Sequence, residues 1–282
     1  MQHQLLIILL KGLVFLKAKK KKKQSSGLRT FFLSMCITLG VGCGIVFLFR
    51  NNLSGLAQSI SNGFHDNRTS DSKQKTQETV LKQTPRADDV YLAGTLFVGD
   101  SRTNGLKATG EIDEGNIVAS DGMSHSSAVT QRVIDRGSRL VTIPEAVSEI
   151  KPSRMVVNFG INGIAWLNEE QFISDYETLL TALEESSPDS VIIIESILPV
   201  SASKERSEPR MANSKIDRYN ELLRELAQKR GHYYLNSASA LKDADGNMAT
   251  EYDSGDGLHF NSDGSKEILN QVLTHAVEDE NR

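Results

Sequence analysis

The sequence predicts an α/β domain, in which a five-stranded parallel sheet lies between two layers of helices, preceded by one transmembrane helix. Three observations lead to this prediction. Short apolar segments alternate with amphipathic segments from residue 89 onward, and an uncharged stretch of 20 residues lies near the N-terminus. The roughly 190 residues of the alternating region are enough to bury one complete core.

The transmembrane helix is predicted over residues 30–49, which contain no charged side chain. As a helix they rise about 30 Å, the thickness of a bilayer's hydrocarbon core. Lys19 to Lys23 precede this stretch, whereas only Arg50 directly follows it. Because basic residues gather on the cytoplasmic side, we expect a single-pass protein of the cell membrane with residues 1–29 in the cytoplasm. A cleaved signal peptide would export the same domain, but Arg50 makes a poor cleavage site.

Charge is unevenly distributed along the chain. The first 50 residues hold nine Lys and Arg and no acidic residue, whereas the rest holds 23 Lys and Arg against 36 Asp and Glu. This excess of acidic residues after residue 50 argues against a nucleic-acid partner and favours neutral or cationic substrates. Both cysteines, Cys36 and Cys43, lie in the predicted membrane helix. The exported part therefore has neither a disulfide nor thiol chemistry.

Residues 50–88 are rich in Asn, Ser, Gln, Thr, Asp and Lys and carry few large apolar side chains. This composition cannot bury enough surface to offset the entropy of ordering, so we expect a flexible extracytoplasmic tether. The folded domain is then predicted over residues 89–282.

The elements of that domain follow from short apolar runs and from helical periodicity. Strands are predicted where runs are β-branched or aromatic and almost wholly apolar, as befits strands covered on both faces. These are Thr95–Val98, Asn116–Ala119, Arg154–Asn158, Ser190–Ser196 and His232–Leu235. Helices are predicted where apolar residues recur with a period near 3.6. These are Pro144–Ile150, Glu169–Glu185, Ala212–Lys229 and Ser262–Ala276.

The first predicted strand runs into Gly99-Asp100-Ser101, which places a serine at the tip of the strand. Helix capping alone favours Asp and Ser there, so the tripeptide is weak evidence by itself. Near the C-terminus, Asp256 precedes His259 by three residues, a spacing found at no other histidine of the chain. In a helical turn this spacing puts both side chains on one face. Asp256 can then orient the imidazole, whose other nitrogen activates Ser101.

A carbonyl attacked by a serine also needs hydrogen-bond donors for its developing negative charge. Ligands gather at the carboxyl ends of parallel strands, where Ser101, Gly122 and Asn162 follow the first, second and third predicted strands. The candidate oxyanion donors are the backbone N–H groups of Ser101 and Gly122 and the side-chain amide of Asn162.

These motifs resemble the four blocks of the SGNH/GDSL hydrolase family. All four occur in order: Gly99-Asp100-Ser101, Gly122, Gly160-Ile-Asn162 and Asp256-Gly-Leu-His259. The match spans about residues 92–276. The resemblance implies the flavodoxin-like SGNH fold and a serine esterase with Ser101, Asp256 and His259 as its catalytic residues. Arg102 stands where the family often has leucine, and Gly163 where an aspartate often follows the asparagine.

Three other features have weaker functional interpretations. His125 could act as a base, but it lacks a suitably spaced carboxylate, which favours a surface or supporting role. Asp243-Ala-Asp-Gly-Asn247 is similar to the start of a calcium loop, yet Ser254 occupies the twelfth position where a bidentate glutamate is needed, so we expect a turn. Trp166 either lines a sugar or acyl pocket or packs in the core.

The resemblance implies a membrane-anchored enzyme that removes a small acyl group, O-acetyl above all, from cell-envelope carbohydrate. It implies neither a cofactor nor a metal. A lysophospholipase or an acyltransferase with the same triad is the nearest alternative. A non-catalytic carbohydrate-binding protein of the same fold is the other, although the joint presence of Ser101, Asn162, Asp256 and His259 argues against it.

Overall fold

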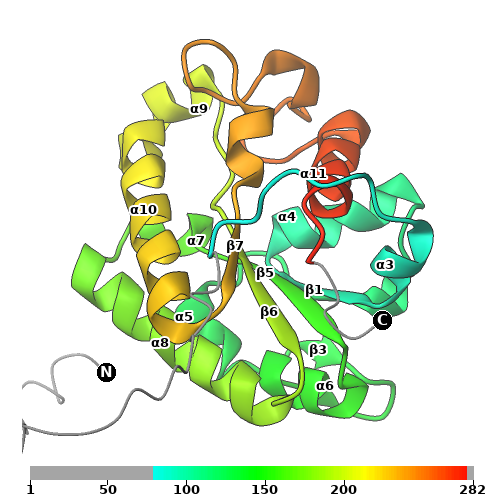
Figure 1. The fold of residues 1–282 in the computed structure, drawn as a ribbon. Coiled ribbons are helices and arrows are strands. Elements are labelled where there is room, and N and C mark those ends of the chain that lie inside the picture. Colours follow the sequence, from blue (N-terminus) through cyan, green and yellow to red (C-terminus); the bar gives the residue numbers. More distant parts are fainter. Residues whose placement is uncertain (1–78, 278–282) are drawn as a thin grey trace, which may run out of the picture. The chain divides into compact units, whose positions relative to one another are not determined.

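A computed structural model describes residues 79–277, and its centre is one parallel sheet (Figure 1). The strands are β1 (Thr95–Gly99), β2 (Ile117–Ala119), β5 (Arg154–Asn158), β6 (Val191–Glu195) and β7 (Tyr233–Leu235). They lie in the order β2-β1-β5-β6-β7 and all pairs are parallel. The five predicted strands are confirmed. Because chain order reverses between β1 and β5, the sheet has its topological switch point at their carboxyl ends.

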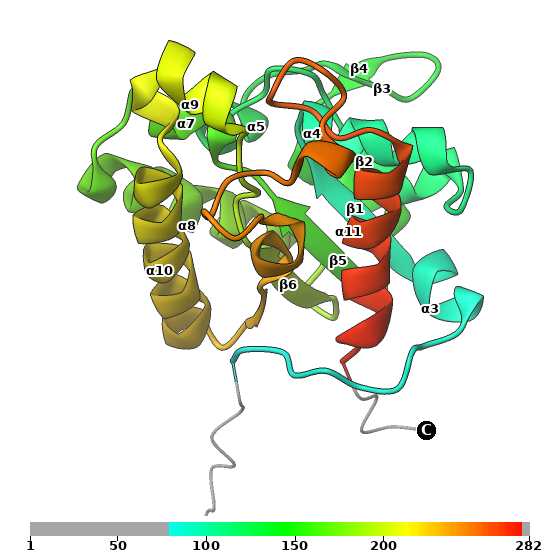
Figure 2. The ribbon, with the colours of Figure 1, turned by 90° about the horizontal axis from the view of Figure 1, so that it is seen from above.

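The sheet is covered on both faces because successive side chains of each strand point to opposite sides. Leu96 and Val98 belong to a core shared with α6 (Ile143–Ile150), α8 (Glu169–Ser186) and α10 (Asn213–Arg230). Phe97 belongs to a second core shared with α3 (Asp89–Ala93) and α11 (Ser262–Thr274). The domain is therefore a three-layer α/β/α sandwich, as predicted, and Figure 2 shows α10 and α11 on either side of the sheet.

Several short elements carry the connections. The helices are α4 (Ser101–Asn104), α5 (His125–Ala128), α7 (Ile161–Ile164) and α9 (Ala202–Ser207), and β3 (Ile134–Asp135) pairs with β4 (Leu140–Val141) in a small hairpin. Turns of 3₁₀ helix are η1 (Gly105–Thr109), η2 (Glu114–Asn116), η3 (Pro209–Met211), η4 (Ser237–Leu241) and η5 (Thr250–Tyr252). A four-residue helix completes only about one turn, so its sequence shows no period.

The boundary between tether and domain needs correction, because residues 80–87 pack on the domain. Val80 forms a parallel bridge with Tyr234, and the Leu81 N–H donates to the Tyr234 carbonyl at 2.9 Å. Farther along, the Ala87 N–H donates to the carbonyl of Leu273 in α11 at 2.8 Å. The polar composition of this segment concealed its packing, because backbone hydrogen bonds and only two apolar side chains, Leu81 and Ala87, attach it to the domain.

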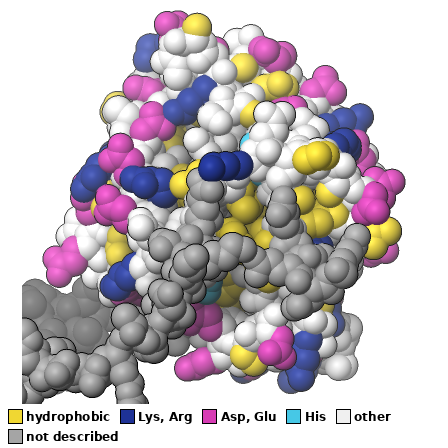
Figure 3. Space-filling model, viewed as in Figure 1, with side chains coloured by type: hydrophobic (Ala, Val, Ile, Leu, Met, Phe, Trp, Pro, Cys, Tyr) yellow, Lys and Arg dark blue, Asp and Glu magenta, His cyan; other side chains and the backbone are white. Residues whose placement is uncertain are grey.

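The predicted cytoplasmic head, the membrane helix over residues 30–49 and most of the tether lie outside the described residues. Within residues 79–277, no helix is both long and apolar enough to cross a bilayer. The described residues contain 19 Lys and Arg against 30 Asp and Glu. Figure 3 shows side chains of both signs interspersed over one face of the domain.

Candidate active site

The turn from β1 into α4 presents Ser101 at the switch point of the sheet. Gly99 ends the strand where no side chain fits, because a Cβ there would lie 2.0 Å from the Thr103 hydroxyl oxygen and 2.5 Å from the Asn158 carbonyl oxygen. Asp100 is the N-cap of α4, and its side chain accepts from the Arg102 N–H at 3.0 Å. Ser101, the first residue of the helix, is partly exposed.

The loop between η5 and α11 carries Asp256 and His259. Asp253 Oδ1 accepts from the N–H groups of Gly255 and Gly257, which folds the chain into a tight turn. Asp256 Oδ1 accepts in turn from the His259 N–H at 2.8 Å, so the aspartate fixes the backbone of the residue that it faces. The turns in this loop thus bring the side chains of Asp256 and His259 together.

Ser101, His259 and Asp256 form a continuous chain of hydrogen bonds across 158 positions of sequence. Ser101 Oγ lies 2.9 Å from His259 Nε2, and His259 Nδ1 lies 2.6 Å from Asp256 Oδ2. Partial burial favours the neutral acid at Asp256, but the hydrogen bonds from His259 and Leu258 outweigh it and hold the pKa of Asp256 well below its usual range. Asp256 therefore stays ionised and can stabilise an imidazolium at His259.

Asn162 and Gly122 approach the same end of the sheet from the loops after β5 and β2. Asn162 Nδ2 donates to Asp100 Oδ2 at 3.1 Å and to the Met123 carbonyl at 3.0 Å, so both N–H groups of the amide are engaged. Donation to an oxyanion would share or replace one of these bonds. For the Gly122 N–H, no acceptor occurs among the backbone hydrogen bonds of residues 79–277.

The model of the GDSL-like lipase/acylhydrolase family matches residues 97–266, a stretch that contains all four motif blocks. The chain belongs to this family. It is accordingly a serine ester hydrolase. Comparison with curated proteins found no match.

Solved structures share this fold at low sequence identity. A GDSL-like lipase from Bacteroides thetaiotaomicron is 16% identical, with a TM-score of 0.51, over 67% of this chain and 89% of that one. A proposed acylhydrolase from Bacteroides fragilis is 17% identical, with a TM-score of 0.51, over 74% and 95% of the two chains. A proposed platelet activating factor from Streptococcus pneumonia is 21% identical, with a TM-score of 0.51, over 64% and 82%.

Arg102, a departure from the usual leucine of GDSL hydrolases, lies buried between the two halves of the site. Its Nη1 donates to the Leu198 carbonyl at 2.6 Å, its Nη2 to the Pro199 carbonyl at 3.1 Å and its Nε to the Leu258 carbonyl at 3.0 Å. Burial lowers the pKa of Arg102 to about 10, so the guanidinium remains a cation at neutral pH. Sequence reasoning gave this residue no role, because its acceptors are backbone carbonyls that no motif records.

Asp100 does more in this GDSL hydrolase than cap a helix. Its side chain is buried and holds the Asn162 amide in place. Burial raises the pKa of Asp100 to about 6, against the opposing influence of the Arg102 cation. The sequence placed Asp100 in the nucleophile motif without a role of its own, and the structure shows that it contacts Asn162.

The three weaker candidates are also placed. His125 is fully buried, its ring centroid lies 4.3 Å from that of Phe172, and burial lowers its pKa to about 4, so a surface position was wrong and the neutral ring supports the fold. Asp243 Oδ1 accepts from the N–H groups of Asp245 and Asn247, which confirms a turn. In residues 79–277 no group of three or more His, Cys, Asp or Glu could hold a metal ion. Trp166 is 71% exposed, so it does not pack in the core.

Proposed function

We propose that this GDSL hydrolase removes a small acyl group, O-acetyl in particular, from cell-envelope carbohydrate outside the cytoplasmic membrane. The hydrogen-bonded chain from Ser101 through His259 to Asp256 is the observation that carries the catalytic part of the proposal. Cleavage of an ester by a serine needs a nucleophile, a proton carrier and a carboxylate that orients the proton carrier. These three side chains meet the three requirements.

Catalysis begins when Ser101 Oγ attacks the ester carbonyl carbon and its proton passes to His259 Nε2. The tetrahedral intermediate collapses as the carbon–oxygen bond to the alcohol breaks, and His259 returns the proton to the leaving alkoxide. Water then attacks the acyl-serine, again with His259 as base, which releases the acid and restores Ser101. Asp256 holds the His259 tautomer that keeps Nε2 free to accept.

We assign the stabilisation of the oxyanion to the backbone N–H groups of Ser101 and Gly122 and to the side-chain amide of Asn162. Ser101 opens α4, where the first backbone N–H groups of a helix have no intrahelical acceptor. The hydrogen bond to Asp100 holds the Asn162 side chain in the site. As negative charge develops, the amide can exchange one of its two hydrogen bonds for a hydrogen bond to the oxyanion.

The acyl specificity can be tested on p-nitrophenyl acetate, butyrate and decanoate and on an acetylated glycan. Release of acetate from the glycan, with kcat/KM falling as the acyl chain lengthens, is the expected result. A preference for decanoate, or for lysophosphatidylcholine over every glycan, would favour the lysophospholipase alternative. Transfer of acetyl to added sugar in preference to water would make the enzyme an acyltransferase.

The membrane location rests on the uncharged residues 30–49 and the basic residues before them. Extraction should then require detergent, and protease added to intact cells should cut between residues 51 and 78 and release an active domain. Full protection of the domain in intact cells, with digestion only after lysis, would place it on the cytoplasmic side and overturn this part of the proposal.

A further inference from the structure

One segment, residues 201–210, joins the two halves of the candidate site along its rim. At its start, the Ser201 N–H donates to the Gly257 carbonyl at 2.9 Å, next to Asp256. At its end, the guanidinium carbon of Arg210 lies 4.0 Å from the centre of the Trp166 ring. Trp166 follows α7, the helix that carries Asn162. Residues 201–210 therefore run from the loop that carries Asp256 and His259 to the end of the helix that carries Asn162.

Trp166 is the most prominent feature of this rim. At 71% exposure it leaves most of an indole ring in solvent, a costly arrangement for a side chain of its apolar area. It lies four residues after Asn162, which is about one helical turn along the chain. An exposed indole beside a catalytic loop provides a flat apolar surface on which a sugar ring can stack, while the Arg210 guanidinium above it supplies donors.

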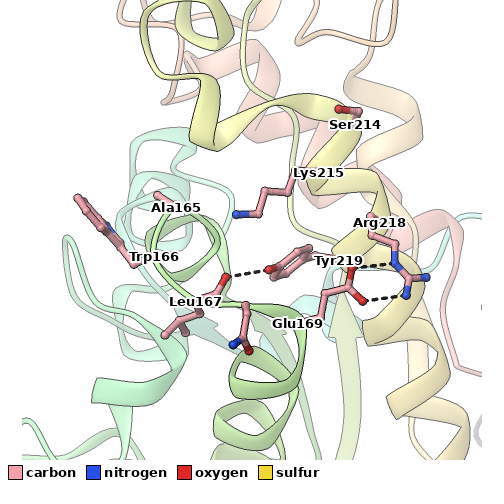
Figure 4. Close-up of a pocket in the computed structure, with 9 residues that line it drawn as sticks. Ala165, Trp166, Leu167, Glu169, Ser214, Lys215, Arg218 and Tyr219 are labelled. Carbon is pink, nitrogen blue, oxygen red and sulfur yellow. Dashed lines mark hydrogen bonds and ion pairs between the residues drawn. The ribbon is translucent and has the colours of Figure 1, made fainter.

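Trp166 also borders a hollow between the end of α7 and the start of α10. The hollow has a volume of about 560 Å³, and the residues around it include Glu169, Lys215, Arg218 and Tyr219. Figure 4 shows Lys215 extending from α10 toward the Trp166 side of this space, while Glu169 and Arg218 pair with each other. The volume lies within the usual range of small-molecule sites.

The charges of this region differ in sign from those of the domain. Residues 201–218 hold five Lys and Arg against three Asp and Glu, in a domain with an excess of acidic residues. Lys215 gives one N–H to the Ile164 carbonyl, and the only ion pair of Arg210 within residues 79–277 is a 3.4 Å contact with Glu208. An ammonium has three donors and a guanidinium five, so both cations retain donors for a ligand.

We propose that Trp166, Arg210 and Lys215 form a subsite for an acidic sugar unit of the acylated glycan, next to the ester-cleaving site. The sugar ring stacks on the indole, and its carboxylate accepts hydrogen bonds from the two cations. The substrate class rests on the proposed function, but binding to the subsite does not require catalysis. The local positive charge thereby selects an acidic substrate, whereas the net negative charge of the domain favours a neutral or cationic one.

Intrinsic fluorescence tests the subsite directly, since Trp166 is the only tryptophan of the whole chain. The full chain in nonionic detergent is titrated with a trimer of 1,4-linked hexuronic acid and with the neutral hexose trimer of the same linkage. The acidic trimer should shift and quench the emission with saturation, and more weakly as salt rises. The neutral trimer should bind at least about 10-fold more weakly.

Variants show whether binding of the acidic trimer depends on Arg210 or on any exposed arginine. Arg210→Ala should raise the Kd for the acidic trimer about 10-fold, and Arg210→Lys should restore part of that loss by keeping the charge. Arg139→Ala is the matched control, because Arg139 is also an exposed, ion-paired arginine, with its side chain 60% exposed against 51% for Arg210. The control should bind the trimer like the unaltered protein.

Equal responses to the two trimers, no response to either, or a response to lysophosphatidylcholine alone would overturn the subsite. Hydrolysis of p-nitrophenyl acetate by the same preparation keeps the two proposals apart. Ester hydrolysis without trimer binding contradicts the subsite and leaves the esterase intact. Saturable binding without ester hydrolysis contradicts the esterase and supports the subsite.

Discussion

Arg102 Nε donates a 3.0 Å hydrogen bond to the carbonyl of Leu258, which joins the residue after the nucleophile to the residue before the base. The other two nitrogens of the same guanidinium donate to the carbonyls of Leu198 and Pro199 in the loop after β6. Ser101 and His259 belong to opposite ends of the domain sequence. Arg102 therefore acts as a positioning residue that sets the distance between their side chains.

Replacement of Arg102 by methionine should lower kcat by at least 10-fold with a smaller change in KM, because the His259 loop loses its anchor while the substrate contacts remain. It should also lower the free energy of unfolding by about 2–4 kcal/mol, since buried carbonyls lose their donors. Steady-state kinetics on p-nitrophenyl acetate and urea unfolding measure the two effects.

Arg154→Met is the matched control for Arg102→Met. Arg154 is also buried, donates to the Tyr91 carbonyl at 3.0 Å, and lies at the start of β5, the opposite end of the sheet from the site. It should lower stability without lowering kcat at a temperature where the protein stays folded. Equal losses of kcat in the two variants would show that Arg102 acts on stability alone.

Asn162→Ala should lower kcat by about 100- to 1,000-fold with little change in KM, because it removes one donor to the oxyanion and leaves the nucleophile in place. The variant should still react with a fluorophosphonate probe at Ser101. Its kcat on p-nitrophenyl acetate is the measurement. A loss below about 5-fold would show that Asn162 only braces Asp100 and Met123.

Asp256→Asn should lower kcat by about 10⁴-fold, because the amide can hold the wrong tautomer of His259. The fold should persist, since Asn can still accept from the backbone N–H groups of Leu258 and His259. A pre-steady-state acylation rate and a thermal unfolding curve test both statements. Near-normal acylation would contradict the role of Asp256.

Glu195 should make the stability of the domain depend on pH. Its buried carboxyl accepts from Ser237 Oγ at 2.6 Å and from Asn158 Nδ2 at 2.9 Å, and burial raises its pKa to about 7. Because the folded protein holds this proton more tightly than the unfolded chain, its contribution to stability is complete below about pH 4.5 and is lost as pH rises through 7.

Glu195→Gln should flatten that dependence, because the amide can accept from Asn158 and donate to Ser237 at every pH. Urea unfolding at pH 5 and pH 8 measures the difference. The exposed Glu221→Gln variant, which should leave the pH dependence unchanged, is the control. A Glu195→Gln variant with the same fall in stability between pH 5 and 8 as the parent would contradict the assignment.

The sequence predicted the sheet well because its strands are short, apolar and bounded by turn residues. Arg154–Asn158 was placed without error, and the other four strands to within one residue at each end. The four motif blocks identified the family through their residue types and their order, because Ser101 and Asn162 follow strands while Asp256 and His259 lie together in the loop between η5 and α11. Elements of four residues, such as α7, escaped prediction because one turn shows no period.

The sequence could not show which side chains bond to backbone carbonyls or which polar side chains become buried. The three carbonyls held by Arg102 leave no trace in residue identity. In the sequence Glu195 is only the polar end of a strand, whereas in the fold burial raises its pKa against the lowering influence of the hydrogen bonds from Ser237 and Asn158. The sequence left open whether Trp166 lines a pocket or packs in the core, because the exposure of its side chain depends on how α7 packs against α10.

Ser101 is the nucleophile of this hydrolase, and covalent labelling by a fluorophosphonate, in which the serine Oγ displaces fluoride to form a phosphonyl-serine, tests this assignment most directly. The purified chain is mixed with a fluorophosphonate, and intact-protein mass spectrometry with peptide mapping locates the adduct. We predict one adduct, on Ser101, with loss of all esterase activity, and no adduct on Ser101→Ala. An adduct on another residue, or near-normal ester hydrolysis by Ser101→Ala, would contradict the mechanism.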